Sequence, residues 1–106
     1  MKSLMLLLPA LLCMPAFAAG PVSAGERLAA TCTACHGTRG NTVADITNSA
    51  LPPLAGQPKE TLLASLKAFK EGSRPATIMT QLAKGYTDEQ LGQIAAWFAA
   101  QKGGAQ

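Results

Sequence analysis

Apolar residues recur at helical spacing in three segments of this chain. The first segment follows Ser23 and Glu26, which stand three residues apart as a capping box. Its small and apolar residues then repeat every three or four positions as far as Cys32 and Cys35. The pattern predicts a helix that begins near Ser23 and carries both cysteines near its end.

Two further helices are predicted in the second half of the chain. One covers about 58–71, with a proline at its first position and Gly72 directly after its end. The other begins at Thr87, which forms a second capping box with Gln90, and runs up to Gly103. Its apolar residues form one stripe, which should face the core.

The segments between these helices are irregular. Gly, Pro, Asn and Ser interrupt residues 37–56 and 72–86, and only 78–83 suggests a short helical turn. No run alternates apolar and polar residues as a half-buried strand would. The predicted fold class is therefore all-α. A loop of about twenty residues is uncommon in so small a domain unless it wraps around something.

Residues 1–18 have the features of a cleaved secretory signal peptide. Lys2 precedes the apolar stretch 4–12, and Ala16 and Ala18 form an A-x-A processing site. An uncleaved membrane anchor is the alternative, but a spanning helix needs about 20 apolar residues and two prolines interrupt this stretch. We expect export to the periplasm, no permanent membrane anchor, and one mature domain over residues 19–106.

The composition of the chain bears on its partners and on its core. The whole chain has nine Lys and Arg against six Asp and Glu, without the dense basic stripe of a nucleic-acid-binding protein. Nucleic acid is therefore not an expected partner. Its five aromatic residues supply only a thin core for a domain of this size. We expect a cofactor to fill the middle.

The motif CTACH carries the strongest chemical signal. Cys32 and Cys35 are one helical turn apart, so their sulfurs project from the same side with an axial offset of about 4.5 Å. That offset suits the two vinyl groups of one porphyrin. His36 then falls beneath the iron, which is the logic of the C-x-x-C-H signal for covalent attachment of haem c.

Three other interpretations of CTACH are open. A disulfide or redox pair suits an oxidising compartment, although no strand precedes the motif as a thioredoxin-like site requires. A structural zinc site would want four nitrogen or sulfur ligands, and the motif offers only Cys32, Cys35 and His36. The third is a chance arrangement in which His36 merely ends a helix.

Two more residue types are candidates for the haem site. Met79 is the one methionine outside the leader, and its thioether could be the second axial ligand, although a lone methionine is usually core filler. His36 needs a partner on its other ring nitrogen, and the carbonyl of Pro52 or Pro53 could supply it, unless LPPLAG is only a turn. With both axial positions taken, the domain should transfer single electrons and catalyse nothing by itself.

Together, CTACH, PPLAG, a methionine toward the C-terminus and a last helix that carries Trp97 resemble class I cytochrome c over nearly all of the mature domain. The resemblance implies three main helices and loops wrapped around one covalent haem c. It implies that the first and last helices cross at Gly25 and Trp97. It also implies that the Pro52 carbonyl supports His36 and that Met79 ligates the iron.

The stretches AATCTACHGTRGN, LKAFKEGSRPATIM and AKGYTDEQL are more narrowly similar to the haem subunit of flavocytochrome c sulfide dehydrogenase. This resemblance implies a heterodimer in which the cytochrome accepts electrons from the flavin of a larger, sulfide-oxidising subunit. The electrons would then pass to a soluble acceptor or an oxidase. Some haem subunits of that family have two cytochrome domains, whereas the single C-x-x-C-H here fits the one-haem type.

Two other functions are open at this point. LAGQ and LKAFK are shared with small soluble cytochromes, so a free-standing class I electron carrier to an oxidase or other redox partner is the first. A haem enzyme or gas-binding sensor is the second, and it would require Met79 to be off the iron.

Overall fold

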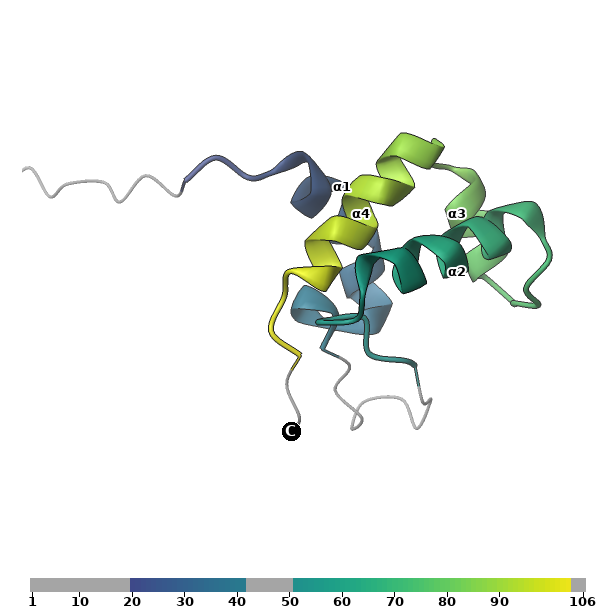
Figure 1. Ribbon diagram of the computed structural model, residues 1–106, viewed down its shortest axis with the longest axis horizontal. Helices are drawn as coiled ribbons and strands as arrows, with labels where there is room; N and C mark the ends of the chain where they lie inside the picture. Colours follow the sequence, from purple (N-terminus) through teal and green to yellow (C-terminus); the bar gives the residue numbers. More distant parts are fainter. Residues whose placement is uncertain (1–19, 42–50, 104–106) are drawn as a thin grey trace, which may run out of the picture.

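The computed structural model describes residues 20–41 and 51–103, and every regular element in this part of the chain is helical (Figure 1). The prediction of an all-α fold with three main helices is confirmed. The predicted leader, 1–18, and part of the predicted long loop, 42–50, lie outside the described residues. The elements are α1 (Ala24–His36), the one-turn helix η1 (Thr38–Gly40), α2 (Lys59–Glu71), α3 (Met79–Lys84) and α4 (Asp88–Ala99).

The predicted caps start these helices as expected. The Ser23 side chain accepts a hydrogen bond from the Glu26 N–H at 3.1 Å and so satisfies one orphan donor of α1. At α4 the capping box is complete, because Thr87 and Gln90 each accept from the other's backbone N–H. Gly72 ends α2 in the left-handed conformation that a side chain would disfavour.

Two helix boundaries differ from the sequence-based prediction. Pro58 is not the first helical residue: its ψ of 135° is extended, and α2 begins at Lys59. The last helix ends at Ala99, several residues before the expected stop at Gly103. Gly103 instead packs on the carbonyl of Ala55, to which an added Cβ would approach within 3.0 Å. A tertiary contact with the 51–57 segment thus draws the chain out of the helix.

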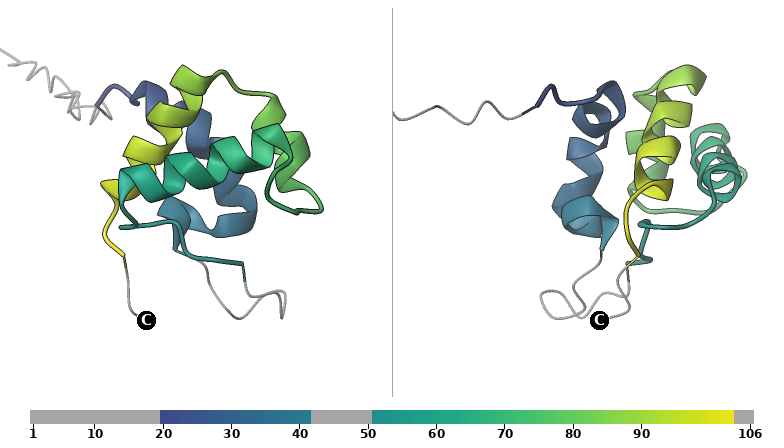
Figure 2. Two further views of the ribbon diagram at one scale, coloured as in Figure 1. Left: turned by 45° about the vertical axis from the view of Figure 1, so that its right-hand side comes forward. Right: turned by 60° about the vertical axis from the view of Figure 1, so that its left-hand side comes forward.

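Helix α4 lies between α1 and α2 (Figure 2). The two helices α1 and α4 approach tightly at Gly25, where a Cβ atom would lie 2.7 Å from the Gln93 carbonyl oxygen and 3.1 Å from the Trp97 Cβ. The predicted crossing of the first and last helices at Gly25 and Trp97 is therefore present. Only a glycine lets the two backbones pack this tightly.

Gly25→Ala should lower the free energy of unfolding by about 1–3 kcal/mol, since the new methyl group forces α1 away from α4. Gly92→Ala is the matched control on α4, where an added Cβ meets nothing within 4 Å. That change should raise stability by about 0.5–1 kcal/mol through helix propensity. Denaturant unfolding of the holoprotein, followed by far-UV circular dichroism, measures both. Equal stability for the two variants would contradict the close crossing.

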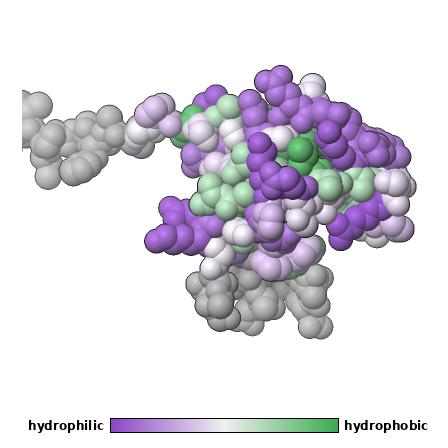
Figure 3. Space-filling view, in the orientation of Figure 1, coloured by the Kyte–Doolittle hydropathy of each residue, from purple (hydrophilic) through white to green (hydrophobic). Residues whose placement is uncertain are grey.

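The core that joins the helices is small. Its buried members are Ala29, Leu62, Leu91, Ile94, Ala95 and Phe98. On the face seen in Figure 3, apolar areas lie between larger hydrophilic ones. No helix within residues 20–41 and 51–103 has the length and apolar character needed to cross a membrane.

An ion pair links the end of α2 to the start of α4. Lys70 Nζ lies 2.9 Å from Asp88 Oδ1, and Lys67 Nζ lies 3.7 Å from Oδ2. The hydrogen bond from Lys70 holds the pKa of the Asp88 carboxyl below its usual range, and the positive charges of both lysines act in the same direction. The pair is exposed to solvent, so we expect it to add little to the stability of the fold.

Candidate functional site

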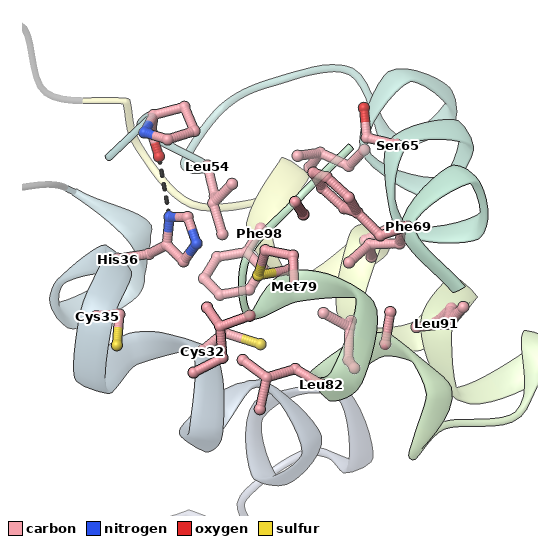
Figure 4. Close-up of a pocket in the computed structure, with 18 of the residues that line it drawn as sticks. Cys32, Cys35, His36, Leu54, Ser65, Phe69, Met79, Leu82, Leu91 and Phe98 are labelled. Carbon is pink, nitrogen blue, oxygen red and sulfur yellow. Dashed lines mark hydrogen bonds between the residues drawn. The ribbon is translucent and has the colours of Figure 1, made fainter. Parts of the chain in front are cut away.

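A cavity of about 420 Å³ lies between the helices and the 51–57 segment, and most of its lining is apolar. The structure brings all five predicted site residues to its wall, although they come from three separate parts of the chain (Figure 4). These residues are Cys32, Cys35, His36, Pro52 and Met79. Their gathering in one cavity is the geometric requirement for a shared ligand.

His36 is the last residue of α1 and is buried, with only 6% of its surface exposed. Its Nδ1 lies 3.1 Å from the Pro52 carbonyl oxygen. Because a carbonyl only accepts, Nδ1 is the donor in this contact, and Nε2 points into the cavity (Figure 4). This is the tautomer and orientation that a metal-binding histidine needs.

The hydrogen bond to His36 shows which of the two prolines, Pro52 or Pro53, supplies the carbonyl. Pro52 directs its carbonyl to the imidazole, whereas the carbonyl of Pro53 accepts a hydrogen bond from the Gln57 side chain. LPPLAG is thus a turn and a support for His36 at the same time, since the two prolines serve different partners.

Cys32 and Cys35 line the cavity one turn apart on α1, and both are free thiols. Cys32 is half-buried, and burial, assisted by the nearby Cys35, raises the pKa of its thiol. The disulfide interpretation of CTACH is therefore not the state of this structure. In the described part of the chain, no group of three or more His, Cys, Asp or Glu could hold a metal ion, so nothing there supports a zinc site.

Met79 is the first residue of α3, which fulfils the prediction of a short helical turn near 78–83. Its half-buried side chain reaches the cavity from the opposite side to His36, with the sulfur facing inward (Figure 4). Among the described residues, Met79 is not part of the hydrophobic core cluster. This position suits a ligand better than a residue that only fills the core.

The cavity wall also carries polar residues that were not predicted from the sequence, and Arg74 is one of them. Its guanidinium carbon lies 4.7 Å from the centre of the Phe69 ring, and its Nη1 donates to Ser65 Oγ at 3.0 Å. Tyr86 also lines the cavity, and its hydroxyl donates to the Leu28 carbonyl at 3.5 Å. Gly72 breaks the helix between Phe69 and Arg74, so no helical spacing rule connects them.

The donor set fits a c-type haem. The cavity has the size and apolar character of a cofactor site. It offers an oriented imidazole from His36, a soft thioether from Met79 on the facing wall, and two thiols at one edge. A thioether and an imidazole on opposite sides, together with two cysteines for attachment, are the groups that haem iron and its vinyl substituents accept.

Comparison with known proteins also indicates a cytochrome c. The sequence matches the family described as cytochrome c over residues 22–102. It is 41% identical over 87 residues to cytochrome c-554(548) of Halomonas halodenitrificans, an alignment that covers 79% of this chain and 100% of that protein. It is 44% identical over 87 residues to cytochrome c4 of Pseudomonas aeruginosa, covering 82% of this chain but 41% of the relative.

A third relative has a more specific name. The chain is 42% identical over 76 residues to the cytochrome subunit of sulfide dehydrogenase of Chlorobaculum tepidum, covering 72% of this chain and 64% of that subunit. The chain thus spans the whole of the Halomonas protein but less than two thirds of the other two.

Proposed function

Since this chain belongs to the cytochrome c family of electron-transfer proteins and carries haem c, we propose that it is a periplasmic, one-haem carrier with His36 and Met79 as axial ligands. The observation that carries this assignment is the entry of both side chains into the same cavity. When bound, the haem supplies a one-electron couple.

The protein's own residues have separate tasks in this proposal. Cys32 and Cys35 hold the group by two thioether bonds, and the 13-residue helix α1 fixes their spacing. Pro52 orients the His36 imidazole through Nδ1. Met79 closes the opposite face, so no coordination position is left for a substrate, and the domain passes electrons without catalysing a reaction of its own.

The proposed electron donor is the flavin-containing subunit of a sulfide dehydrogenase, with which this protein would form a heterodimer. The likeness to the cytochrome subunit of sulfide dehydrogenase supports this partner, since identity reaches 42%. A soluble acceptor or an oxidase would receive the electrons. Location in the periplasm follows from the predicted leader at 1–18, which is cleaved in this proposal to leave a domain of 19–106.

A free-standing electron carrier is the second candidate. One observation favours it: the alignment covers the full length of cytochrome c-554(548), whereas the sulfide dehydrogenase subunit is longer than the region matched. This carrier would use the same haem site and differ only in having no permanent flavoprotein partner.

The test is an absorption spectrum of the protein purified gently from its native cells, before and after addition of sulfide. A sulfide dehydrogenase subunit should co-purify with flavin in a fixed ratio to haem, and sulfide should reduce its haem. The same chain produced alone is the control and should be reduced by dithionite but not by low sulfide. If the native protein contains no flavin and sulfide does not reduce its haem, the result supports the free-standing carrier instead.

A further inference from the structure

The segment that leads to Met79 is exposed throughout. Residues 72–78 connect α2 to α3, and none of them is buried. Ile78, directly before Met79, exposes 57% of its surface. Residues 74–78 also line the cavity, so this segment forms part of the wall of the proposed haem site. Helix α3, which begins at Met79, packs on α2, and polar contacts hold the segment that precedes it on the same helix.

Those contacts are concentrated at Ser73 and Arg74. The Ser73 hydroxyl and the Arg74 backbone N–H both donate to the Ala68 carbonyl, at 3.3 Å and 3.1 Å. The Arg74 guanidinium also donates to Ser65 Oγ at 3.0 Å and stacks over the Phe69 ring. Ser65, Ala68 and Phe69 are spaced three and four residues apart, so they share one face of α2.

Beyond Arg74 the anchoring stops. Within the described residues, 75–77 make no hydrogen bond to another element. The next fixed point is α3 itself, where the Ile78 carbonyl accepts from Gln81 and Leu82. In the described part of the chain, Arg74 is thus the last residue before Met79 that is hydrogen-bonded to α2.

We propose that Arg74 is a latch: its contacts with Ser65 and Phe69 hold segment 72–78 on α2 and so keep Met79 on the iron. This inference rests on the proposed ligation by Met79. Detachment of the segment would let Met79 leave and would open a coordination position. The apparent affinity for an external ligand follows the fraction of molecules in that open state. Loss of the latch raises this fraction.

The contacts also specify arginine. A guanidinium is planar, so it can stack on Phe69 and donate to Ser65 at once, whereas an ammonium is a compact point charge. Arg74→Lys keeps the positive charge at the cavity wall but loses this geometry. The lysine variant therefore separates a latch from a residue that acts only through its charge.

The experiment compares holoprotein variants Arg74→Leu, Arg74→Lys and Ser65→Ala with the parent. Arg27→Leu is the matched control, because among the described residues the Arg27 guanidinium donates only to the Val22 carbonyl, before α1, and Arg27 does not line the cavity. Imidazole is titrated into the oxidised protein, the methionine–iron charge-transfer band is recorded, and hydrogen exchange is measured over 72–79. Ser65→Ala removes one hydrogen bond and should fold even if the arginine variants do not.

Arg74→Leu should bind imidazole at least about tenfold more tightly and exchange 72–79 at least about tenfold faster, as expected for loss of one cation–π contact and one charged hydrogen bond. In both readouts, Arg74→Lys should behave like Arg74→Leu, and Arg27→Leu should behave like the parent. Ser65→Ala should give values between those of the parent and those of Arg74→Leu. If Arg74→Lys behaves as the parent, or if Arg74→Leu changes neither readout, the latch is overturned. A parent that lacks the charge-transfer band and binds imidazole as tightly as Met79→Ala overturns the ligation by Met79, and the latch with it.

Discussion

Replacing Cys32 and Cys35 together by alanine should abolish both haem attachment and stable folding. The two thiols at the cavity edge are the proposed attachment points. Without them the chain cannot retain a haem covalently. We expect no haem to remain with the polypeptide on a denaturing gel, and far-UV circular dichroism far below that of the parent.

The loss of folding follows from the position of the cavity. Its walls include Leu62, Leu91, Ile94 and Phe98, which are also the large residues of the core. Leaving about 420 Å³ unfilled among them would cost up to roughly 10 kcal/mol at about 24 cal/mol per Å³. That upper bound is comparable with the whole stability of a small domain, about 5–15 kcal/mol. We therefore expect haem to be a structural part of this fold.

The single variants Cys32→Ala and Cys35→Ala are the controls. Each keeps one proposed thioether, so each should remain folded and carry haem, with a pyridine haemochrome spectrum shifted toward that of a single attachment. A double variant that is well folded without haem would contradict the prediction, because it would show that the helices form a sufficient core alone.

Local sequence signals were enough to predict most of the fold. Ser23 and Thr87 cap their helices by bonds to residues three positions later, and Gly72 ends α2 by its own conformation. Each of these signals acts within one turn of the chain. The candidate site was partly predictable for the same reason, because Cys32 and His36 are placed by the helix that contains them both.

Contacts between distant segments could not be predicted in this way. The choice of Pro52 over Pro53 depends on a carbonyl 16 residues from the imidazole that it meets. The early end of α4 depends on Gly103 packing on Ala55. Arg74 reaches α2 across a helix break, so its role depends on the turn at Gly72 and not on any periodic pattern. These features needed the three-dimensional structure.

Met79→Ala should leave the haem attached but change its chemistry. The proposed attachment points are on α1, whereas Met79 is on α3, so truncation removes an axial ligand without touching the thioethers. A thioether ligand favours ferrous iron and raises the reduction potential. Its loss should lower the potential by on the order of 0.1 V, a fraction of the roughly 0.8 V range that axial ligands span. Redox titration measures the change.

Leu82→Ala provides the matched control for this variant. Leu82 lines the same cavity from the same helix, three residues after Met79, so its truncation also removes apolar volume but no candidate ligand. Both variants should lose some stability through the cavity that they create. Only Met79→Ala should lose the methionine–iron charge-transfer band and, once reduced, bind carbon monoxide readily at neutral pH. If the parent already binds carbon monoxide as readily and the potential is the same in both, Met79 only fills space, and a gas-binding or enzymatic role gains support over electron transfer.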